Sequence, residues 1–407
     1  MPFSKLLHFF LIFMIVVVCG SCGSGDSGPS SRGSTSGAGT PTSPAVSGNN
    51  VMVITVNGSL CSSNSYANKS CVSVTICIPG TSTCQTIDGI LLDTGDSGLR
   101  IFKQAISVSL IQVTSGSNPV AECIQYADGS SVWGPVKLAG VVLGNETAVQ
   151  VPIQVIDYTF AGAPAACSGA YQTPVDAGYN GSLGLSFFAQ DCGSVCASSA
   201  GNGVYFACSG ATCSGVTVPL SNQVQNPVAL LPVDNNGVIV QLPSIPASGA
   251  TSASGYLILG IGTQSNNVPS AVMAYSADAS GNFITIFNGS NYSGFIDTGS
   301  NGLFFPSPST STLPDCAAPA SAWYCPSATR NLTATNEGTT GVPSGAVAFQ
   351  IGNFDTLLTS SNNVFPDIGG NNAGVFDWGL PFYFGRNVYI GIEGKVSSLG
   401  SGLYWAY

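Results

Sequence analysis

Two aspartates, Asp93 and Asp297, stand in matching short motifs that could place a pair of carboxylates in one site. Residues 91–95 read Leu-Leu-Asp-Thr-Gly, and residues 295–299 read Phe-Ile-Asp-Thr-Gly. When two carboxylates lie within hydrogen-bond distance, one keeps a proton while the other stays charged, and the pair titrates as a unit. The charged member can take a proton from water while the protonated member donates to a carbonyl oxygen. This chemistry hydrolyses an amide without a covalent intermediate.

The similarity between the two motifs continues past the aspartates. A Gly-Leu pair stands five residues after each aspartate, at residues 98–99 and 302–303. Further along, Gly-Leu-Ser-Phe at residues 184–187 is matched by Gly-Leu-Pro-Phe at residues 379–382. A single Asp-Thr-Gly often does no more than end a strand in a turn. Elements that repeat in order and approximate spacing instead predict an internal duplication, with one aspartate from each copy sharing a site.

Length and composition predict a mostly β chain of two lobes. A chain of 407 residues exceeds the size at which one hydrophobic core keeps growing. Only 7% of the residues are charged, while Gly, Ser, Thr, Asn and Val are abundant, which is typical of short strands and tight turns. Together with the duplication, this predicts an N-terminal lobe over residues 51–225 and a C-terminal lobe over residues 226–407, with a cleft between them.

The amino-terminal residues predict export and a tether. The apolar run at residues 6–18 is shorter than a transmembrane helix requires and predicts a signal peptide over residues 1–21. Cys22 lies in a motif similar to the lipobox of bacterial lipoproteins, in which the cysteine is lipidated. The alternative is an ordinary secretory signal with an incidental cysteine. Residues 22–50 are rich in Gly, Ser, Thr and Pro, which is typical of a flexible linker. We therefore expect an exported, lipid-anchored protein of the bacterial cell envelope, sorted to the outer membrane and facing the periplasm or the cell surface.

Cysteine and histidine usage excludes several kinds of chemistry. Of the 14 cysteines, Cys19 and Cys22 lie in the leader, and the even number that remains in an exported chain predicts disulfides. The sequence leaves their connectivity open, but close pairs could form small loops: Cys77 with Cys84, Cys208 with Cys213, and Cys316 with Cys325. A zinc site at Cys192 and Cys196 is disfavoured because an oxidising compartment removes thiolates. The only histidine, His8, lies in the leader, so catalytic triads, His-ligated zinc and histidine bases are excluded.

The charge balance argues against nucleic acid as a partner. The chain has 9 basic and 19 acidic residues, a formal net charge of −10 at neutral pH, and no basic patch or lysine-bearing phosphate loop. We expect no metal and no organic cofactor. We also expect a monomer whose partners are a peptide or unfolded protein substrate and the membrane that holds its lipid anchor.

The two motifs, at residues 92–95 and 296–300, resemble the active-site loops of pepsin-like aspartic proteases. Tyr126 begins the sequence Tyr-Ala-Asp-Gly-Ser, which resembles the tip of the hairpin, or flap, that folds over substrate in that family. Later segments match in family order, at residues 181–185, 255–260 and 379–389. The chain is still more similar to a set of uncharacterised bacterial envelope lipoproteins through residues 190–194, 226–230, 376–381 and 404–407. The resemblance covers about residue 51 to the end and implies a mostly β, bilobal pepsin-like fold with an inter-lobe cleft.

By resemblance, the chain is expected to be an aspartic endopeptidase that activates water between Asp93 and Asp297. The other positions carried over from the family hold the active-site loops or contact substrate: Tyr126, Thr94, Gly95, Asp96, Thr298, Gly299 and Ser300. The alternative is a catalytically weak or inactive lipoprotein that uses the same cleft to bind peptides or envelope components. A glycosidase is disfavoured because two identical turns predict a symmetric pair, whereas glycosidases need carboxyls roughly 5 Å or more apart in unlike environments.

Asp96 departs from the family pattern, which has Ser or Thr after the first Asp-Thr-Gly. That hydroxyl donates to the adjacent carboxylate, and Ser300 keeps this pattern in the second copy. An ionised third carboxylate cannot donate, and its charge would raise the apparent pKa of the pair or force Asp96 itself to take a proton. Ser97 could supply the missing hydroxyl, or Asp96 could point away from the pair.

Overall fold

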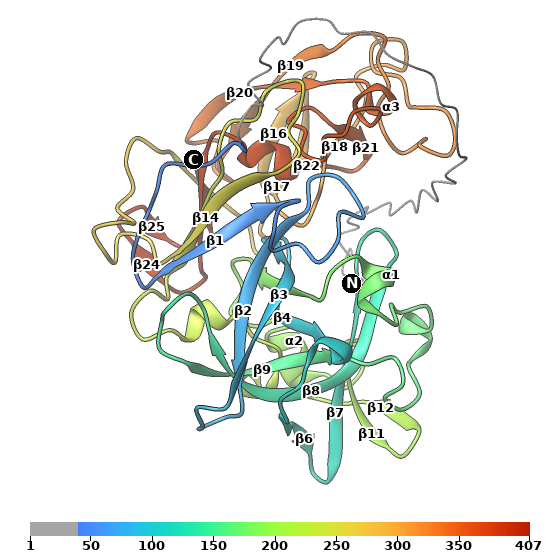
Figure 1. The fold of residues 1–407 in the computed structure, drawn as a ribbon, viewed down its shortest axis with the longest axis vertical. Coiled ribbons are helices and arrows are strands. Elements are labelled where there is room, and N and C mark those ends of the chain that lie inside the picture. The colour runs from blue at the N-terminus through green and yellow to red at the C-terminus, as the bar shows by residue number, and fades with distance from the viewer. Residues whose placement is uncertain (1–39) are drawn as a thin grey trace, which may run out of the picture.

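The computed structural model describes residues 40–407, and its secondary structure is mainly strand (Figure 1). Strands make up 42% of the described residues and helices 8%. The strands form a β-barrel and a half-barrel, so the prediction of a mostly β chain is confirmed. The helices are short: α1 (Pro174–Ala177), α2 (Ser194–Ser198), α3 (Phe354–Leu357) and the 3-10 turns η1 (Lys103–Ala105), η2 (Ala165–Cys167), η3 (Leu220–Asn222), η4 (Pro227–Leu230) and η5 (Leu380–Tyr383).

The largest sheet combines strands from the beginning, middle and end of the chain. Its members are β1 (Val51–Val56), β2 (Ser70–Cys77), β3 (Cys84–Asp93), β4 (Ser97–Phe102), β5 (Ile111–Gln112), β6 (Thr114–Ser115), β7 (Asn118–Gln125), β8 (Ser131–Val142), β9 (Val149–Ile156), β10 (Gly181–Leu185), β11 (Tyr205–Ser209), β12 (Thr212–Gly215), β13 (Gly237–Gln241), β14 (Ala253–Leu259), β15 (Ala274–Ser276), β23 (Asn387–Gly391) and β26 (Tyr404–Ala406). The antiparallel pair β1 and β14, side by side in Figure 1, joins the N-terminal half of the chain to the C-terminal half.

A second sheet lies wholly in the C-terminal half. It contains β16 (Phe283–Phe287), β17 (Ser290–Ile296), β18 (Leu303–Phe305), β19 (Arg330–Glu337), β20 (Ser344–Ile351), β21 (Gly369–Asn371) and β22 (Val375–Trp378). A small hairpin, β24 (Val396–Ser397) with β25 (Gly400–Ser401), completes the strands of the described chain.

The repeated motifs occupy the same strand arrangement in both halves. In the N-terminal half, β10 pairs parallel with β3 and antiparallel with β4. In the C-terminal half, β22 pairs parallel with β17 and antiparallel with β18. Asp93 is the last residue of β3, and Asp297 directly follows β17. The repeated sequence motifs therefore correspond to the same three-stranded unit in each half, with an aspartate at the end of the equivalent strand.

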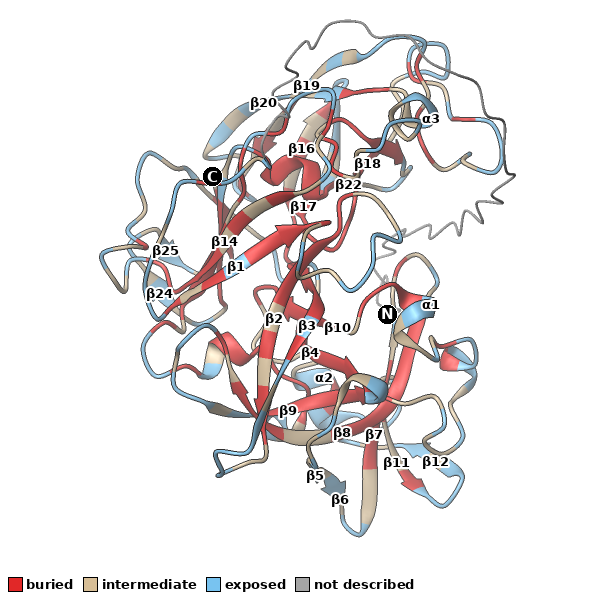
Figure 2. Ribbon diagram, in the orientation of Figure 1, coloured by how far each residue is buried: buried red, intermediate tan, exposed pale blue. Residues whose placement is uncertain are grey.

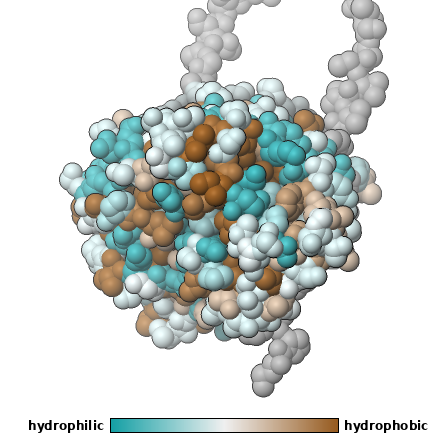
Figure 3. All heavy atoms as spheres, turned by 90° about the horizontal axis from the view of Figure 1, so that it is seen from below, coloured by the Kyte–Doolittle hydropathy of each residue, from teal (hydrophilic) through white to brown (hydrophobic). Residues whose placement is uncertain are grey.

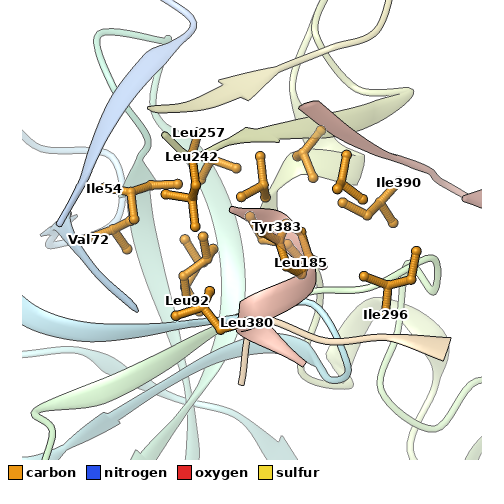
Figure 4. Close-up of a cluster of buried hydrophobic side chains, with 14 of the residues drawn as sticks. Ile54, Val72, Leu92, Leu185, Leu242, Leu257, Ile296, Leu380, Tyr383 and Ile390 are labelled. Atoms are coloured by element: carbon orange, nitrogen blue, oxygen red, sulfur yellow. The ribbon is translucent and has the colours of Figure 1, made fainter. Parts of the chain in front are cut away.

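Apolar side chains from both halves meet in one large core beneath the motifs. Figure 4 shows Leu92, directly before Asp93, in the same cluster as Ile296, directly before Asp297, and both are fully buried. In Figure 2 the buried stretches follow the central strands of each half, whereas the loops at the periphery are exposed. Full burial of a Leu or Ile side chain contributes about 1.5–3 kcal/mol, so the residues before each aspartate fix the ends of β3 and β17.

Disulfides join all twelve cysteines of the described chain. The three close pairs suggested by spacing are present, together with Cys61–Cys71, Cys123–Cys167 and Cys192–Cys196. The last of these removes the thiolates that a zinc site at Cys192 and Cys196 would need. Six disulfides are typical of a protein outside the cytoplasm.

The amino-terminal predictions fall largely outside the described residues. The predicted signal peptide and Cys22 lie in residues 1–39, as does most of the predicted linker. Part of the predicted linker instead pairs with β14, because the Ser43 amide donates to Ser254 O at 3.0 Å and the Ser254 amide donates to Pro41 O at 2.9 Å. Within residues 40–407, no helix is long and apolar enough to span a membrane. On the face seen in Figure 3, apolar and polar residues are interspersed.

Candidate active site

The structure brings Asp93 and Asp297 together in a buried site. Their exposed fractions are 7% and 1%, respectively. The Gly95 amide donates to Asp93 Oδ1 and to Asp297 Oδ1, each at 2.9 Å. One backbone donor is therefore shared by two carboxylates that are 204 residues apart in sequence, which places them as a pair.

Each glycine of the repeated motif lies against the aspartate of the other motif. A Cβ atom on Gly95 would lie 2.7 Å from Asp297 Cγ, and one on Gly299 would lie 2.9 Å from Asp93 Cγ. Real Cβ atoms essentially never approach so closely, so no larger residue fits either position without a shift of the carboxyl group. The glycines are required because the two loops approach each other so closely, which sequence spacing alone does not reveal.

The two threonines tie the loops to each other. The Thr94 amide donates to Thr298 Oγ1 at 3.1 Å, and the Thr298 amide donates to Thr94 Oγ1 at 3.0 Å. Each hydroxyl in turn donates to the other half of the molecule, Thr94 to Ile296 O at 3.3 Å and Thr298 to Leu92 O at 2.7 Å. All four residues are buried, so these reciprocal bonds hold the two aspartates in a nearly symmetric arrangement.

The surroundings of the pair are less symmetric. Ser300 Oγ lies 3.0 Å from Asp297 Oδ2 and 2.6 Å from Asp377 Oδ2. A hydroxyl has one proton, so Ser300 can donate to only one of these carboxyl groups. Burial and the nearby Asp297 raise the pKa of Asp377 well above its usual range. We therefore expect protonated Asp377 to donate to Ser300, leaving the Ser300 hydroxyl to donate to Asp297.

Asp377 was missed by sequence reasoning, although a signal for it was present. It is an acidic residue in the otherwise apolar sequence Phe-Asp-Trp of strand β22, and it is only 2% exposed. Charged groups are rarely buried without a specific partner, so an acid at such a position indicates a functional or structural contact. Its partner, Ser300, lies 77 residues earlier and could not be identified without the fold.

The side chain of Asp96 is held by an arginine at the edge of the site. Its carboxylate accepts from Arg100 Nη1 at 2.7 Å, while its amide donates to Asp93 Oδ1 at 3.0 Å. The Ser97 hydroxyl does not replace the missing donor, because it contacts Ser186 Oγ at 2.6 Å and donates to Phe188 O at 3.0 Å. The carboxyl group of Asp96 is therefore held in an ion pair with Arg100, and a backbone amide supplies the donor to Asp93.

Electrostatics distinguish the two aspartates. Burial, the neighbouring Asp297 and then Asp96 raise the pKa of Asp93 well above its usual range. Asp297 accepts hydrogen bonds from the amides of Gly95 and Gly299, and from the Ser300 hydroxyl under the proton arrangement argued above. Three donors therefore converge on Asp297, whereas burial and the neighbouring carboxylates make Asp93 the member of the pair that is placed to hold the shared proton.

A small cavity adjoins Asp93 on the side of the hairpin formed by β7 and β8. The hairpin turns at Tyr126, whose amide donates to Ser130 O at 2.9 Å. Tyrosines dominate the lining of the cavity, whose residues include Tyr66, Leu91, Tyr126, Tyr171, Tyr179 and Ser182. Tyr126 therefore lines the same cavity as Asp93, and this cavity is also lined by the polar residues Asp128, Ser130, Ser182 and Asn301.

Within the described residues, one group of side chains is spaced as metal ligands would be, Cys316, Cys325 and Asp355. Cys316 and Cys325 form a disulfide, so they offer no thiolate to a metal. The group does not fit a metal centre, and it is not part of the site around Asp93.

Buried carboxyl groups predict greater stability in mild acid. Burial raises the pKa of Asp367 to about 6, and the pKa values of Asp93, Asp191 and Asp377 are also raised, first of all by burial. Each group binds its proton more tightly in the folded state than in the unfolded state, so the free energy of unfolding rises as pH falls through the folded pKa. Urea unfolding should therefore show a higher midpoint at pH 5 than at pH 8.

The Asp367→Asn variant provides the control for this pH dependence. It should flatten the part of the stability curve near pH 6 and leave the remaining slope unchanged, because the other buried groups still titrate. Asp157 acts in the opposite direction, since Lys103 and Thr159 lower its pKa, but that effect lies below the range tested. A midpoint that falls steadily from pH 8 to pH 5 would contradict protonation of these buried carboxyl groups in the folded state.

The fold and the site define a mostly β protein with a buried pair of aspartates supplied by a duplicated strand unit. The family model described as Protein of unknown function (DUF3443) matches residues 46–407, so the chain belongs to this family. No curated protein matches the sequence.

Proposed function

We propose that the protein is a pepsin-like aspartic endopeptidase that hydrolyses peptide bonds with water activated between Asp93 and Asp297. The observation that carries this proposal is the Gly95 amide, which donates to both carboxylates at 2.9 Å. A bilobal pepsin-like fold is supported by the strand unit that β3, β4 and β10 form in one half and β17, β18 and β22 form in the other.

The asymmetry of the pair suggests a role for each carboxyl group. Ionised Asp297 takes a proton from a water molecule lying between the two groups, while Asp93 donates its proton to the carbonyl oxygen of the peptide. When the tetrahedral intermediate collapses, Asp297 gives the proton it took from water to the departing amine, and Asp93 takes a proton back from a hydroxyl of the intermediate, so the pair regains its starting state. The site must hold one proton on the pair, so turnover should follow a bell-shaped pH profile set by the two apparent pKa values of the pair. Tyr126 lies on the hairpin beside Asp93, in position to cover a bound peptide.

The alternative function is peptide binding without hydrolysis, and Asp96 is the residue that favours it. An unpaired negative charge on Asp96 would disfavour hydrolysis. The guanidinium of Arg100 lies 2.7 Å from Asp96 and offsets this charge. Hydrolysis is therefore the function that the site supports better. Six disulfides support export, and we propose that Cys22 anchors the protein to the outer membrane of a bacterial envelope.

The proposal is tested by incubating the purified protein with a library of unstructured peptides at pH values from about 3 to 7. Cleavage detected by mass spectrometry, and lost in Asp297→Asn, would support the endopeptidase. Cleavage by Asp96→Ser but not by the wild type would indicate a protease silenced at one residue. Retention of peptides without cleavage by either protein would favour the binding alternative.

The Ser300 contacts give a further prediction about the rate of cleavage. Ser300→Ala removes a donor to ionised Asp297 and should lower the rate about tenfold or more, as expected for a hydrogen bond to a charged group. Asp377→Asn should lower it by less than about threefold, because an Asn amide can donate to Ser300 as a protonated carboxyl does. The two rates are compared with the wild type at the pH of maximal turnover. Equal losses in the two variants would contradict this arrangement of protons.

A further inference from the structure

Arg100 of strand β4 is buried beside the candidate site and contacts three carboxylates. Its Nη1 lies 2.7 Å from Asp96 Oδ2, and its Nη2 lies 3.2 Å from both Glu122 Oε1 and Asp191 Oδ2. The side chains of Arg100, Glu122 and Asp191 are at most 1% exposed, whereas that of Asp96 is 22% exposed. A buried guanidinium is costly unless such partners surround it, so this cluster is a built feature of the fold.

The cluster connects the loop of the first aspartate to the hairpin above it. Asp96 directly follows Gly95, and its amide donates to Asp93. Glu122 lies on β7, the strand that leads into Tyr126 at the hairpin turn. A guanidinium can hold partners on two sides through its planar fork, and here it joins the two segments that carry Asp93 and Tyr126.

We propose that Arg100 is a positioning residue for the pair: it holds the Asp96 carboxylate in place and offsets the charge that Asp96 would otherwise exert on Asp93. This inference rests on the proposed function and adds to it the residue that makes a third carboxylate compatible with a working pair. The sequence agrees with this role, since the acid at position 96 is accompanied by a base four residues later.

Asp96 is the acid of the cluster that lies nearest the pair, since its amide contacts Asp93. The other titratable groups around Arg100 lie farther along the cluster. Burial and the neighbouring Glu122 raise the pKa of Asp191 well above its usual range, whereas Arg100 acts in the opposite direction. Asp191 Oδ1 also accepts from the Tyr205 hydroxyl at 2.7 Å. Burial raises the pKa values of Tyr205 and Tyr126, so both phenols stay neutral from pH 3 to 8.

The test follows the apparent pKa values of the pair by NMR titration of the full chain labelled with 13C at the aspartate carboxyl carbons. The signals of the pair are assigned by their loss in Asp93→Asn and Asp297→Asn. Arg100→Gln should raise the upper apparent pKa by about one unit, because the charge on Asp96 is no longer offset. Asp96→Asn should lower it, because a negative charge near Asp93 is removed. The double variant should return close to the wild-type value.

Lys103→Gln is the matched control, because it removes one positive charge from an exposed ion pair with Asp157. It should leave the pair's titration unchanged. If Arg100→Gln does not fold, the direction of the Asp96→Asn shift still decides. A coupled pair that titrates identically in Asp96→Asn and wild type would overturn the role of Arg100. If Asp93 and Asp297 titrate independently in the wild type, the proposed function itself fails. The measurement requires no turnover, so it distinguishes failure of the proposed function from failure of the role of Arg100.

Discussion

Replacing Asp93 or Asp297 by Asn is expected to reduce peptide cleavage by at least about 1,000-fold while the fold is retained. An Asn side chain can neither accept the proton of the attacking water as a base nor transfer a proton as an acid. General acid and general base catalysis each contribute typically about 10²–10⁴-fold, and both steps use this pair. Initial rates of cleavage of one fluorescent peptide, measured across the pH range, give the effect directly.

Two comparisons separate loss of chemistry from loss of structure in these variants. Asp88→Asn changes an exposed acid on the same strand as Asp93 and should keep the wild-type rate. The double variant of Asp93 and Asp297 should be little worse than either single variant, because residues that act as a unit are not additive. A single variant that keeps a tenth or more of the wild-type rate would contradict the paired mechanism.

Gly95→Ala is expected to lower the rate of cleavage by about 100-fold and to destabilise the protein by about 1–3 kcal/mol. The added Cβ would lie 2.7 Å from Asp297 Cγ, so the loop or the carboxyl group must move. A displacement of this kind also breaks the geometry in which the Gly95 amide donates to both carboxylates. Cleavage rates and urea unfolding of the same preparation measure the two effects.

Gly169→Ala is a suitable control for the added methyl group. A Cβ at Gly169 would meet no atom within 4 Å, and its backbone does not have the positive φ that disfavours other residues. Its stability and rate should match the wild type. Full activity in Gly95→Ala would mean that the two loops do not approach each other so closely, and the case for a shared site would weaken.

Much of the site could be predicted because it is carried by a local repeat. The Asp-Thr-Gly motifs follow apolar pairs that end β3 and β17, and such pairs are recognisable without any knowledge of tertiary contacts. The hairpin at Tyr126 has a local signal of the same kind, since Asp128 and Gly129 favour a tight turn between β7 and β8. Spacing also suggested three of the six disulfides, namely those that close short loops.

The parts that were missed depend on residues far apart in the chain. Asp377 is paired with Ser300 only because β22 lies beside β17, and no local pattern determines that neighbour. The pairing of Arg100 with Asp96 has no local signal, because a basic residue four positions away on a strand is more often exposed. Its burial depends on Glu122 and Asp191, which come from two other segments. Buried charge networks are properties of the assembled fold, whereas turns and apolar runs are properties of the local sequence.

The most direct test of the account is cleavage of an unstructured peptide in water enriched with 18O, at the pH of the highest rate. Water activated by Asp93 and Asp297 attacks the carbonyl carbon, so each new carboxyl terminus should carry 18O from the first turnover, and Asp297→Asn should produce no new termini. No covalently modified protein should accumulate, because the mechanism forms no acyl intermediate. Absence of cleavage by the wild type at every pH, or cleavage that Asp297→Asn retains in full, would contradict the central claim.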